Sequence, residues 1–137
     1  MTDAASSSKW VLLVDDDQDL RESIGESLEA AGFTVVGKAN GREALDYLMA
    51  NELPLAILLD LLMPVMNGWQ FCEERKAHPS LAEIPIIAMS AAVSRDPWSP
   101  YFLDVDDFVA KPIDLDDLIA KLHSYGQRST EARRARR

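Results

Sequence analysis

The sequence has no apolar run long enough to cross a membrane, and it contains a single cysteine among its 137 residues. A membrane-spanning helix needs about 20 consecutive apolar residues. Residues 1–8 are polar and serine-rich, without the apolar core of a signal peptide. The lone cysteine, Cys72, cannot form an internal disulfide. These absences predict a cytoplasmic protein with no membrane partner, in which Cys72 is a buried, unreactive residue.

Charge is distributed unevenly along the chain. The formal net charge is -9, yet residues 128–137 contain five of the 14 basic residues and only one of the 23 acidic ones. The remainder therefore carries -13, and such an acidic body would repel the phosphates of a nucleic acid. We expect no nucleic-acid partner, a disordered N-terminal tail over residues 1–8, and a solvated, frayed basic tail over residues 126–137.

Short apolar runs alternate with segments of helical periodicity along a chain of one domain's length. The runs at 10–14 and 55–59 are apolar without interruption, which is typical of strands buried on both faces of a parallel sheet. The alternation predicts an α/β fold whose parallel sheet is covered by helices on both faces. The predicted strands are 10–14, 34–39, 55–60, 85–90 and 107–110. The predicted helices have buried stripes at Leu20, Ile24, Leu28 and Ala31, at Ala44, Leu45, Leu48 and Met49, over residues 69–77, and at Leu115, Leu118, Ile119 and Leu122.

Polar residues and prolines indicate where helices begin and where one is interrupted. Asp17 or Asp19 is the expected N-cap of the first helix, and Asp114 is the expected N-cap of the last. Pro97 and Pro100 fall where a helix should connect the fourth strand to the fifth. A proline inside a helix costs about 3 kcal/mol. We therefore expect the fourth helix to be short, displaced or partly unwound.

Four of the predicted strands end in polar side chains. Asp15 and Asp16 follow the first strand, Asp60 ends the third, Ser90 ends the fourth, and Lys111 follows the fifth. The carboxyl ends of parallel strands lie along one edge of a sheet, so these side chains should share one crevice. Each residue alone has an ordinary explanation as a helix cap, a strand-end hydroxyl or a turn, but together they indicate a site.

The predicted crevice has the chemistry of a phosphoryl acceptor. Three carboxylates repel one another unless a cation offsets their charge, and Mg²⁺ favours such oxygen ligands. Asp60 would attack phosphorus in line, while the metal and Lys111 neutralise the phosphoryl oxygens and Ser90 donates a hydrogen bond to one of them. The predicted product is an aspartyl phosphate.

Four stretches together resemble the receiver domain of two-component response regulators over residues 9–125. They are VLLVDDDQDLRE (11–22), LLDLLMPVMNG (58–68), PIIAMSA (85–91) and DDFVAKP (106–112). The resemblance implies a flavodoxin-like, doubly wound sheet of five strands in the order 2-1-3-4-5. It also implies phosphorylation of Asp60 by a histidine kinase or a histidine phosphotransfer protein.

The resemblance further implies a set of metal ligands. Asp16, Asp60 and the main-chain carbonyl of Leu62 would bind Mg²⁺ directly, and Asp15 would bind it through water. Mn²⁺ is the alternative ion.

Other implied features concern the response to phosphorylation. Ser90 would move toward the phosphoryl group, and the ring of Phe108 would turn inward behind it. Because phenylalanine lacks a hydroxyl, such a switch would act through packing alone. Leu62 and Ala92 occupy positions that tune hydrolysis in the family, and since neither can orient a water, we expect slow loss of the phosphoryl group. The resemblance also implies a cis peptide bond before Pro112.

We interpret the chain as a receiver, either stand-alone or cut from a longer protein, that signals by phosphorylation-dependent binding of a downstream protein not identified by the sequence. It is expected to be a monomer or weak dimer and to catalyse only its own phosphorylation and dephosphorylation. The sequence 104–106 replaces the Gly-Ala-Asp usual in the family. With the two prolines, this replacement predicts an altered output surface.

Three alternative functions differ in what they require of the strand ends. An aspartyl-phosphate phosphohydrolase would need a second acid where Leu62 stands. A flavodoxin-like binder of a nucleotide or flavin would need a glycine-rich or hydroxyl-rich phosphate loop where residues 15–17 are all aspartate. A receiver that takes no phosphoryl group and acts only as a scaffold would not need the complete set of acceptor residues.

Overall fold

Five parallel strands form one sheet in the order β2-β1-β3-β4-β5. The computed structural model describes residues 10–90, 96, 98–99 and 102–135, with side chains described up to residue 126. The strand order and the parallel pairing confirm the predicted doubly wound, flavodoxin-like α/β fold. In chain order the elements are β1 (Trp10–Val14), α2 (Gln18–Ala30), β2 (Thr34–Lys38), α3 (Gly41–Ala50), β3 (Ala56–Asp60), α4 (Gly68–Lys76), β4 (Ile86–Met89), β5 (Asp107–Val109) and α5 (Leu115–Ala135).

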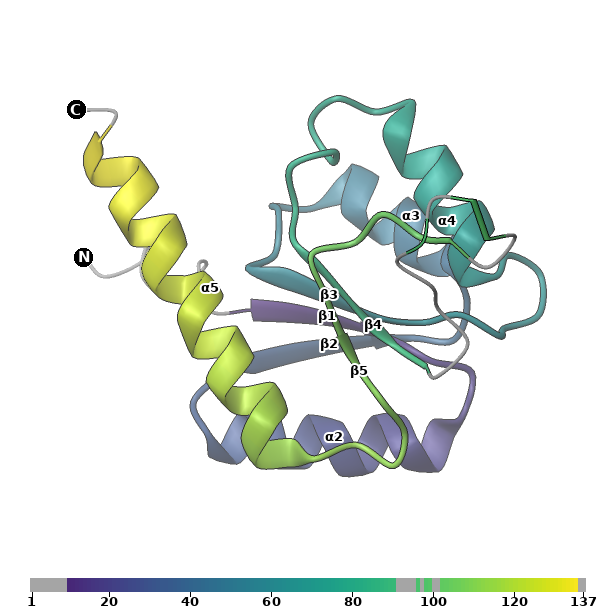
Figure 1. The fold of residues 1–137 in the computed structure, drawn as a ribbon. Helices are drawn as coiled ribbons and strands as arrows, with labels where there is room; N and C mark the ends of the chain where they lie inside the picture. The colour runs from purple at the N-terminus through teal and green to yellow at the C-terminus, as the bar shows by residue number, and fades with distance from the viewer. Residues whose placement is uncertain (1–9, 91–95, 97, 100–101, 136–137) are drawn as a thin grey trace.

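Alternate residues of the central strands face two separate apolar cores, because successive side chains of a strand point to opposite faces of the sheet. Leu12 and Val14 pack on one face with residues of α3 and α4. Val11 and Leu13 pack on the other face with residues of α2 and α5. Figure 1 shows these two pairs of helices on opposite sides of the sheet. Burial on both faces accounts for the unbroken apolar runs that predicted these strands.

Side-chain caps fix where the helices begin. The Asp17 side chain accepts a hydrogen bond from the Leu20 N–H and is the N-cap of α2, so the choice between Asp17 and Asp19 is settled. Asn67 and Gln70 form a capping box at the start of α4. The Asp114 side chain accepts from the Asp117 N–H at the start of α5, as predicted. Each such cap satisfies backbone N–H groups that have no partner within the helix.

The buried stripe of α3 is narrower than the sequence pattern predicted. Ala44, Leu45 and Leu48 are buried, but Met49 is 56% exposed. An α-helix turns about 100° per residue, so Met49 lies about 90° from the middle of that stripe. The prediction of an inward Met49 is therefore wrong. Cys72 is buried as predicted, and burial raises the pKa of its thiol to about 11.

The connection from β4 to β5 contains no helix among its described residues, 96, 98–99 and 102–106. A turn is closed by a hydrogen bond from the Ser99 N–H to the Asp96 carbonyl, and Leu103 is buried in the core that includes α4. Asp106 then joins the two strands, because its carboxylate accepts from the Ile86 N–H and its own N–H donates to the Ile86 carbonyl. The two prolines on which the prediction depended lie outside the described residues.

The last helix is much longer than its apolar stripe. α5 continues to Ala135, so the prediction of a frayed tail is wrong over residues 126–135. Residues 127–135 include no proline, and they are rich in arginine and alanine, which favour helices. Figure 1 shows α5 running away from the sheet toward the C-terminus. The predicted N-terminal tail, residues 1–8, lies outside the described residues.

Candidate functional site

Three carboxylates converge at the carboxyl edge of the sheet. Asp15 and Asp16 follow β1, and Asp60 ends β3. Carboxylate oxygens of all three lie within 4.8 Å of one another, which is a group that could hold a metal ion. Asp15 and Asp60 are buried, with 0% and 5% of their surface exposed, whereas Asp16 is exposed. The predicted grouping of these carboxylates at the ends of two neighbouring strands is confirmed.

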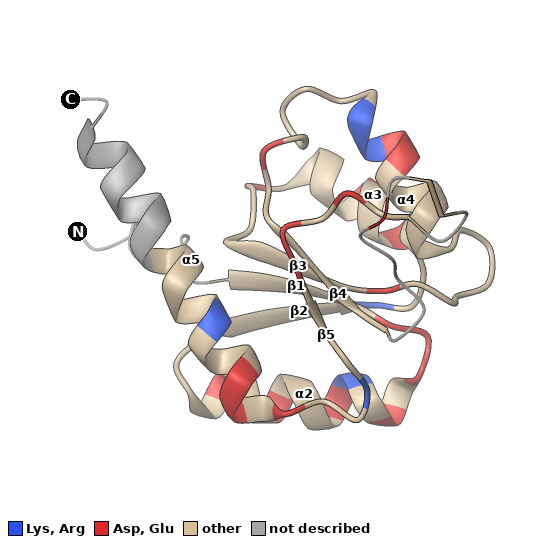
Figure 2. Ribbon diagram, viewed as in Figure 1, with Lys and Arg blue, Asp and Glu red and all other residues tan. Residues whose placement is uncertain are grey.

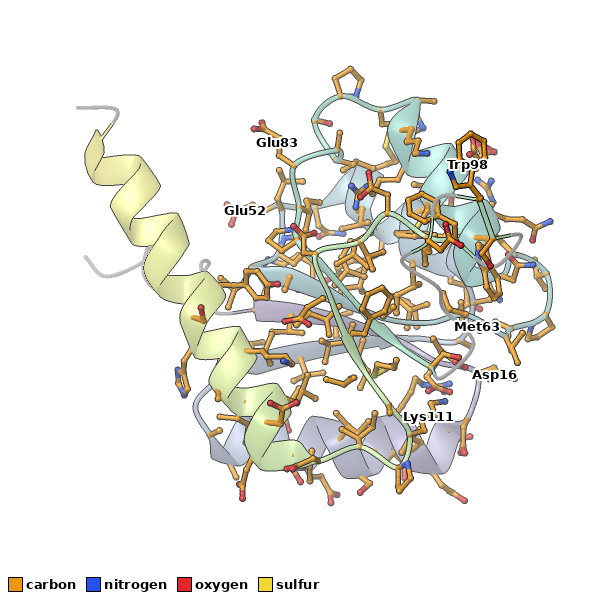
Figure 3. All side chains as sticks on the ribbon, in the orientation of Figure 1. Asp16, Glu52, Met63, Glu83, Trp98 and Lys111 are labelled. Carbon is orange, nitrogen blue, oxygen red and sulfur yellow. The ribbon has the colours of Figure 1, made fainter. Side chains whose placement is uncertain are left out.

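Lys111 lies between the two buried carboxylates. Its Nζ is 3.0 Å from Asp15 Oδ2 and 3.4 Å from Asp60 Oδ1. Figure 3 shows Lys111, Asp16 and Met63 at the same end of the sheet. The peptide bond from Lys111 to Pro112 is cis, as the resemblance implies. The ammonium therefore reaches the cluster from the segment that follows β5.

The hydrogen bonds of Asp60 leave one carboxylate oxygen available. Asp60 Oδ1 accepts from the Leu61 N–H at 2.8 Å and contacts the Lys111 ammonium. In the part of the chain that the structure describes, Asp60 Oδ2 takes part in no hydrogen bond or ion pair. An ionised carboxylate can bind through both oxygens. Oδ2 is therefore the atom that can act as a ligand or a nucleophile without breaking an existing contact.

The electrostatics of the cluster follow from burial and from charge repulsion. Burial raises the pKa of Asp60 above its usual value and the charge of Asp15 raises it further, while Lys111 opposes both effects. For Lys111, burial alone would lower the pKa, but the hydrogen bond and charge of Asp15 and the charge of Asp60 outweigh burial and raise it. The ammonium thus stays charged while two buried carboxylates share it, and the cluster carries more negative charge than it can offset.

The other predicted residues that the structure describes are Ser90, Phe108 and Leu62. Ser90 directly follows β4, whose Met89 pairs with Asp60 across the sheet, and it is half-buried. Phe108 is half-buried on β5 and packs against the core shared by α3 and α4. Leu62 is 68% exposed beside the site. The other predicted hydrolysis-tuning residue, Ala92, lies outside the described residues.

Sequence reasoning missed one residue in contact with the cluster. Arg21, on α2, donates a hydrogen bond from Nη1 to the main-chain carbonyl of Asp15. An arginine on the polar side of an amphipathic helix gives no sign that it reaches a backbone carbonyl, because such residues are usually solvated. Only the three-dimensional placement of α2 against β1 reveals the contact.

A doubly wound sheet with an acidic cluster and a lysine at its carboxyl edge is the arrangement that the resemblance to receiver domains implies. A family model, the response regulator receiver domain, matches residues 11–123. The chain therefore belongs to the response regulator receiver domain family. Receiver domains are in general signalling modules that bind Mg²⁺ at such a cluster and are phosphorylated by histidine kinases.

Named relatives and solved structures agree with this assignment. Response regulator MprA of Mycolicibacterium vanbaalenii is 35% identical over 124 residues, which cover 88% of this chain and 51% of that protein. A protein-glutamate methylesterase/protein-glutamine glutaminase of Treponema pallidum is 39% identical over 93% of this chain but 34% of its own length. The chain thus spans about half the length, or less, of these relatives.

Structural similarity extends over nearly the whole chain. The chemotaxis response regulator CheY4 of Vibrio cholerae superposes with a TM-score of 0.75 at 26% identity, covering 86% of this chain and 98% of that one. The signal receiver domain of a histidine kinase from Syntrophus aciditrophicus gives a TM-score of 0.74 at 28% identity, covering 88% and 91%. Among the described residues of this chain, no helix has the length and apolar character that membrane crossing requires.

Proposed function

We propose that this receiver domain accepts a phosphoryl group on Asp60 in a reaction that depends on Mg²⁺. The observation that carries the proposal is the grouping of three carboxylates within 4.8 Å, with Lys111 held between the two that are buried. The unengaged Oδ2 of Asp60 is the nucleophile. Its attack on phosphorus forms an Asp60–O–P bond and breaks the bond from phosphorus to the donor, which leaves with the electron pair.

The donor set fits a hard dication. Three carboxylates within reach of one another are oxygen ligands of the kind that Mg²⁺ binds while it keeps several waters, and Mn²⁺ accepts the same ligands. Asp16 and Asp60 would hold the ion directly together with the Leu62 carbonyl, and Asp15 would hold it through water. A bound dication supplies neutralisation of charge on the phosphoryl oxygens. Lys111 adds a second cation, and Ser90 adds a hydrogen-bond donor.

The proposed donor is the phosphohistidine of a sensor histidine kinase or a histidine phosphotransfer protein. In the signalling step Ser90 moves toward the new phosphoryl group and Phe108 repacks behind it, which changes the surface that a downstream protein binds. The domain catalyses only its own phosphorylation and dephosphorylation, acts in the cytoplasm, and is a monomer or weak dimer. Nucleic acid and membranes are not its partners.

Incubation with acetyl phosphate tests the acceptor chemistry without a partner. With Mg²⁺, intact mass is expected to show a gain of one phosphoryl group on the wild-type chain, and no gain after chelation with EDTA. The variant Asp60→Asn should gain nothing under either condition, while Asp46→Asn, which changes an exposed carboxylate on α3, should behave like wild type. Absence of the gain in folded wild-type protein would reject the proposal in favour of the scaffold function.

Loss of the phosphoryl group is expected to be slow. Leu62 and Ala92, the two positions that tune hydrolysis in the family, carry no group that can orient an attacking water. Once excess acetyl phosphate is removed, the phosphorylated mass should persist for many minutes or longer in Mg²⁺. Leu62→Gln places an amide beside Asp60 and should shorten that time. A wild-type half-life of seconds would contradict this expectation.

A further inference from the structure

Arg21 connects α2 to the acidic cluster through the backbone of Asp15. The Arg21 Nη1 donates a hydrogen bond of 2.5 Å to the Asp15 carbonyl oxygen. That carbonyl lies just beyond the end of β1, whose last residue is Val14. The Asp15 N–H still pairs with the neighbouring strand, because it donates to the Lys38 carbonyl at 3.1 Å. The guanidinium therefore supplies a donor to the Asp15 carbonyl at the point where the backbone hydrogen bonds between β1 and β2 end.

The contacts of Asp15 leave none of its polar atoms without a partner. Its carbonyl accepts from Arg21, its N–H donates to Lys38, its Oδ1 accepts from the Asp17 N–H at 2.9 Å, and its Oδ2 accepts from Lys111 at 3.0 Å. Such a fully bonded buried carboxylate is held in one position. Arg21 supplies the contact that fixes the peptide unit on the C-terminal side of Asp15.

That peptide unit determines where Asp16 points. A peptide bond is planar, so the Asp15 carbonyl and the Asp16 N and Cα lie in one plane. In the described part of the chain the Asp16 carboxylate accepts no hydrogen bond and forms no ion pair, so its own side chain does little to hold it. The direction of Asp16 toward Asp60 therefore depends on the backbone that Arg21 anchors.

The surroundings of Arg21 favour an anchoring role over a general electrostatic one. Its side chain lines a groove of about 310 Å³ between α2 and β2, together with Glu22 and Glu26. Figure 2 shows the acidic residues spread along α2. Among the described residues the guanidinium nevertheless forms no ion pair with a carboxylate. The Arg21 side chain passes over Gly37 on β2, where an added Cβ would lie 3.4 Å from Arg21 Cδ, an ordinary contact distance.

We propose that Arg21 is a positioning residue of the divalent-metal site. By holding the Asp15 carbonyl, it fixes the peptide that carries Asp16 and so keeps the Asp16 and Asp60 carboxylates at a spacing that one cation can bridge. The inference rests on the proposed function only in requiring that the cluster binds a divalent cation. Outer contacts that orient metal ligands typically contribute 10- to 100-fold to metal affinity.

A titration of the full chain with Mn²⁺, in which the free ion is measured by electron paramagnetic resonance, tests the proposal without any phosphorylation. Arg21→Met keeps a long side chain but removes every donor, and is expected to weaken Mn²⁺ binding about tenfold. Arg21→Lys keeps a donor and the charge, and should bind within about threefold of wild type. If Arg21 acted only through its positive charge, its removal would strengthen cation binding instead, so the sign of the change decides.

Arg75→Met is the matched control. Arg75 also donates to backbone carbonyls, those of Ala82 and Ile84, but it does so beside α4 and away from the cluster. This variant should lose thermal stability while keeping wild-type affinity for Mn²⁺. An equal loss of affinity in Arg75→Met, or unchanged or tighter binding in Arg21→Met, would overturn the positioning role. Absence of Mn²⁺ binding by the wild-type chain would instead contradict the proposed function.

Discussion

Replacing Asp60 with asparagine is expected to stabilise the fold when no divalent cation is present. Burial and the charge of Asp15 both raise the pKa of Asp60, so the ionised carboxylate is unfavourable in the folded state at neutral pH. Asparagine removes that charge and still offers an oxygen to the Leu61 N–H, while Lys111 keeps Asp15 as its partner. In EDTA at pH 7 we expect the free energy of unfolding to rise, against the usual direction for a point mutation.

The pH dependence of this gain in stability follows from the raised pKa of Asp60. Because the folded pKa of Asp60 lies above the unfolded value, the destabilisation by its charge is absent at a pH below the unfolded pKa. It develops as the pH rises through the folded pKa and is complete above it. Denaturant unfolding in EDTA should therefore show the advantage of Asp60→Asn shrinking toward acidic pH and levelling off once the pH exceeds the folded pKa of Asp60.

Addition of Mg²⁺ should make the wild-type chain more stable than the Asp60→Asn variant. A ligand that binds only the folded state stabilises it in proportion to its affinity, and the wild-type chain keeps the full set of carboxylates. Asp60→Asn loses one of them and should gain little from the ion. Asp46→Asn removes an exposed carboxylate paired with Arg42, and should change stability by less than about 0.5 kcal/mol in either buffer. A destabilised Asp60→Asn in EDTA would contradict the proposed repulsion.

The sequence predicted those parts of the molecule whose structure is determined by a local pattern of residues. The continuous apolar runs at β1 and β3 follow from burial on both faces of the sheet, and the polar residues that end them necessarily meet at one edge. A strand order is not encoded locally, and it came from the resemblance of the motifs to a known family. The same order explains how Lys111 can reach the cluster, because only β4 separates β5 from β3 in the sheet.

The features that escaped prediction depend on contacts between distant segments. The hydrogen bond from Arg21 to Asp15 requires α2 to be placed against β1, and the periodicity of the sequence does not indicate that placement. The bonds of Asp106 to Ile86 join residues 20 positions apart. The extension of α5 was missed for a different reason. Its last residues are charged and lack an apolar stripe, so they were interpreted as a frayed tail although their helix propensity is high.

The close contact of α4 with the end of β3 carries the largest expected effect on stability. Gly68 is the first residue of α4, and its N–H donates to the Leu61 carbonyl at 2.9 Å. A Cβ added at this position would lie 2.5 Å from Leu61 Cδ2 and 2.8 Å from both the Asp60 carbonyl oxygen and Leu61 Cα. Two of these three atoms belong to the backbone, so no change of rotamer relieves the clash. The start of α4 can pack here only without a side chain.

Gly68→Ala is therefore expected to lower the free energy of unfolding by about 2–3 kcal/mol, the upper part of the range for overpacked sites. Because the clash pushes on the backbone that carries Asp60, the folded fraction should also accept phosphoryl groups from acetyl phosphate more slowly at saturating Mg²⁺. Denaturant unfolding and the rate of the mass gain measure the two effects separately.

Gly25→Ala is the control that separates the clash from the general consequence of replacing a glycine. A Cβ at Gly25, inside α2, would meet only Val35 Cγ1 at 3.8 Å, which is an ordinary contact. Alanine is favoured over glycine in a helix by about 1 kcal/mol, so Gly25→Ala should be neutral or stabilising and should leave phosphorylation unchanged. A Gly68→Ala chain as stable as wild type would mean that α4 can move away from β3. In that case the position of Asp60 would not depend on how tightly α4 packs against its strand.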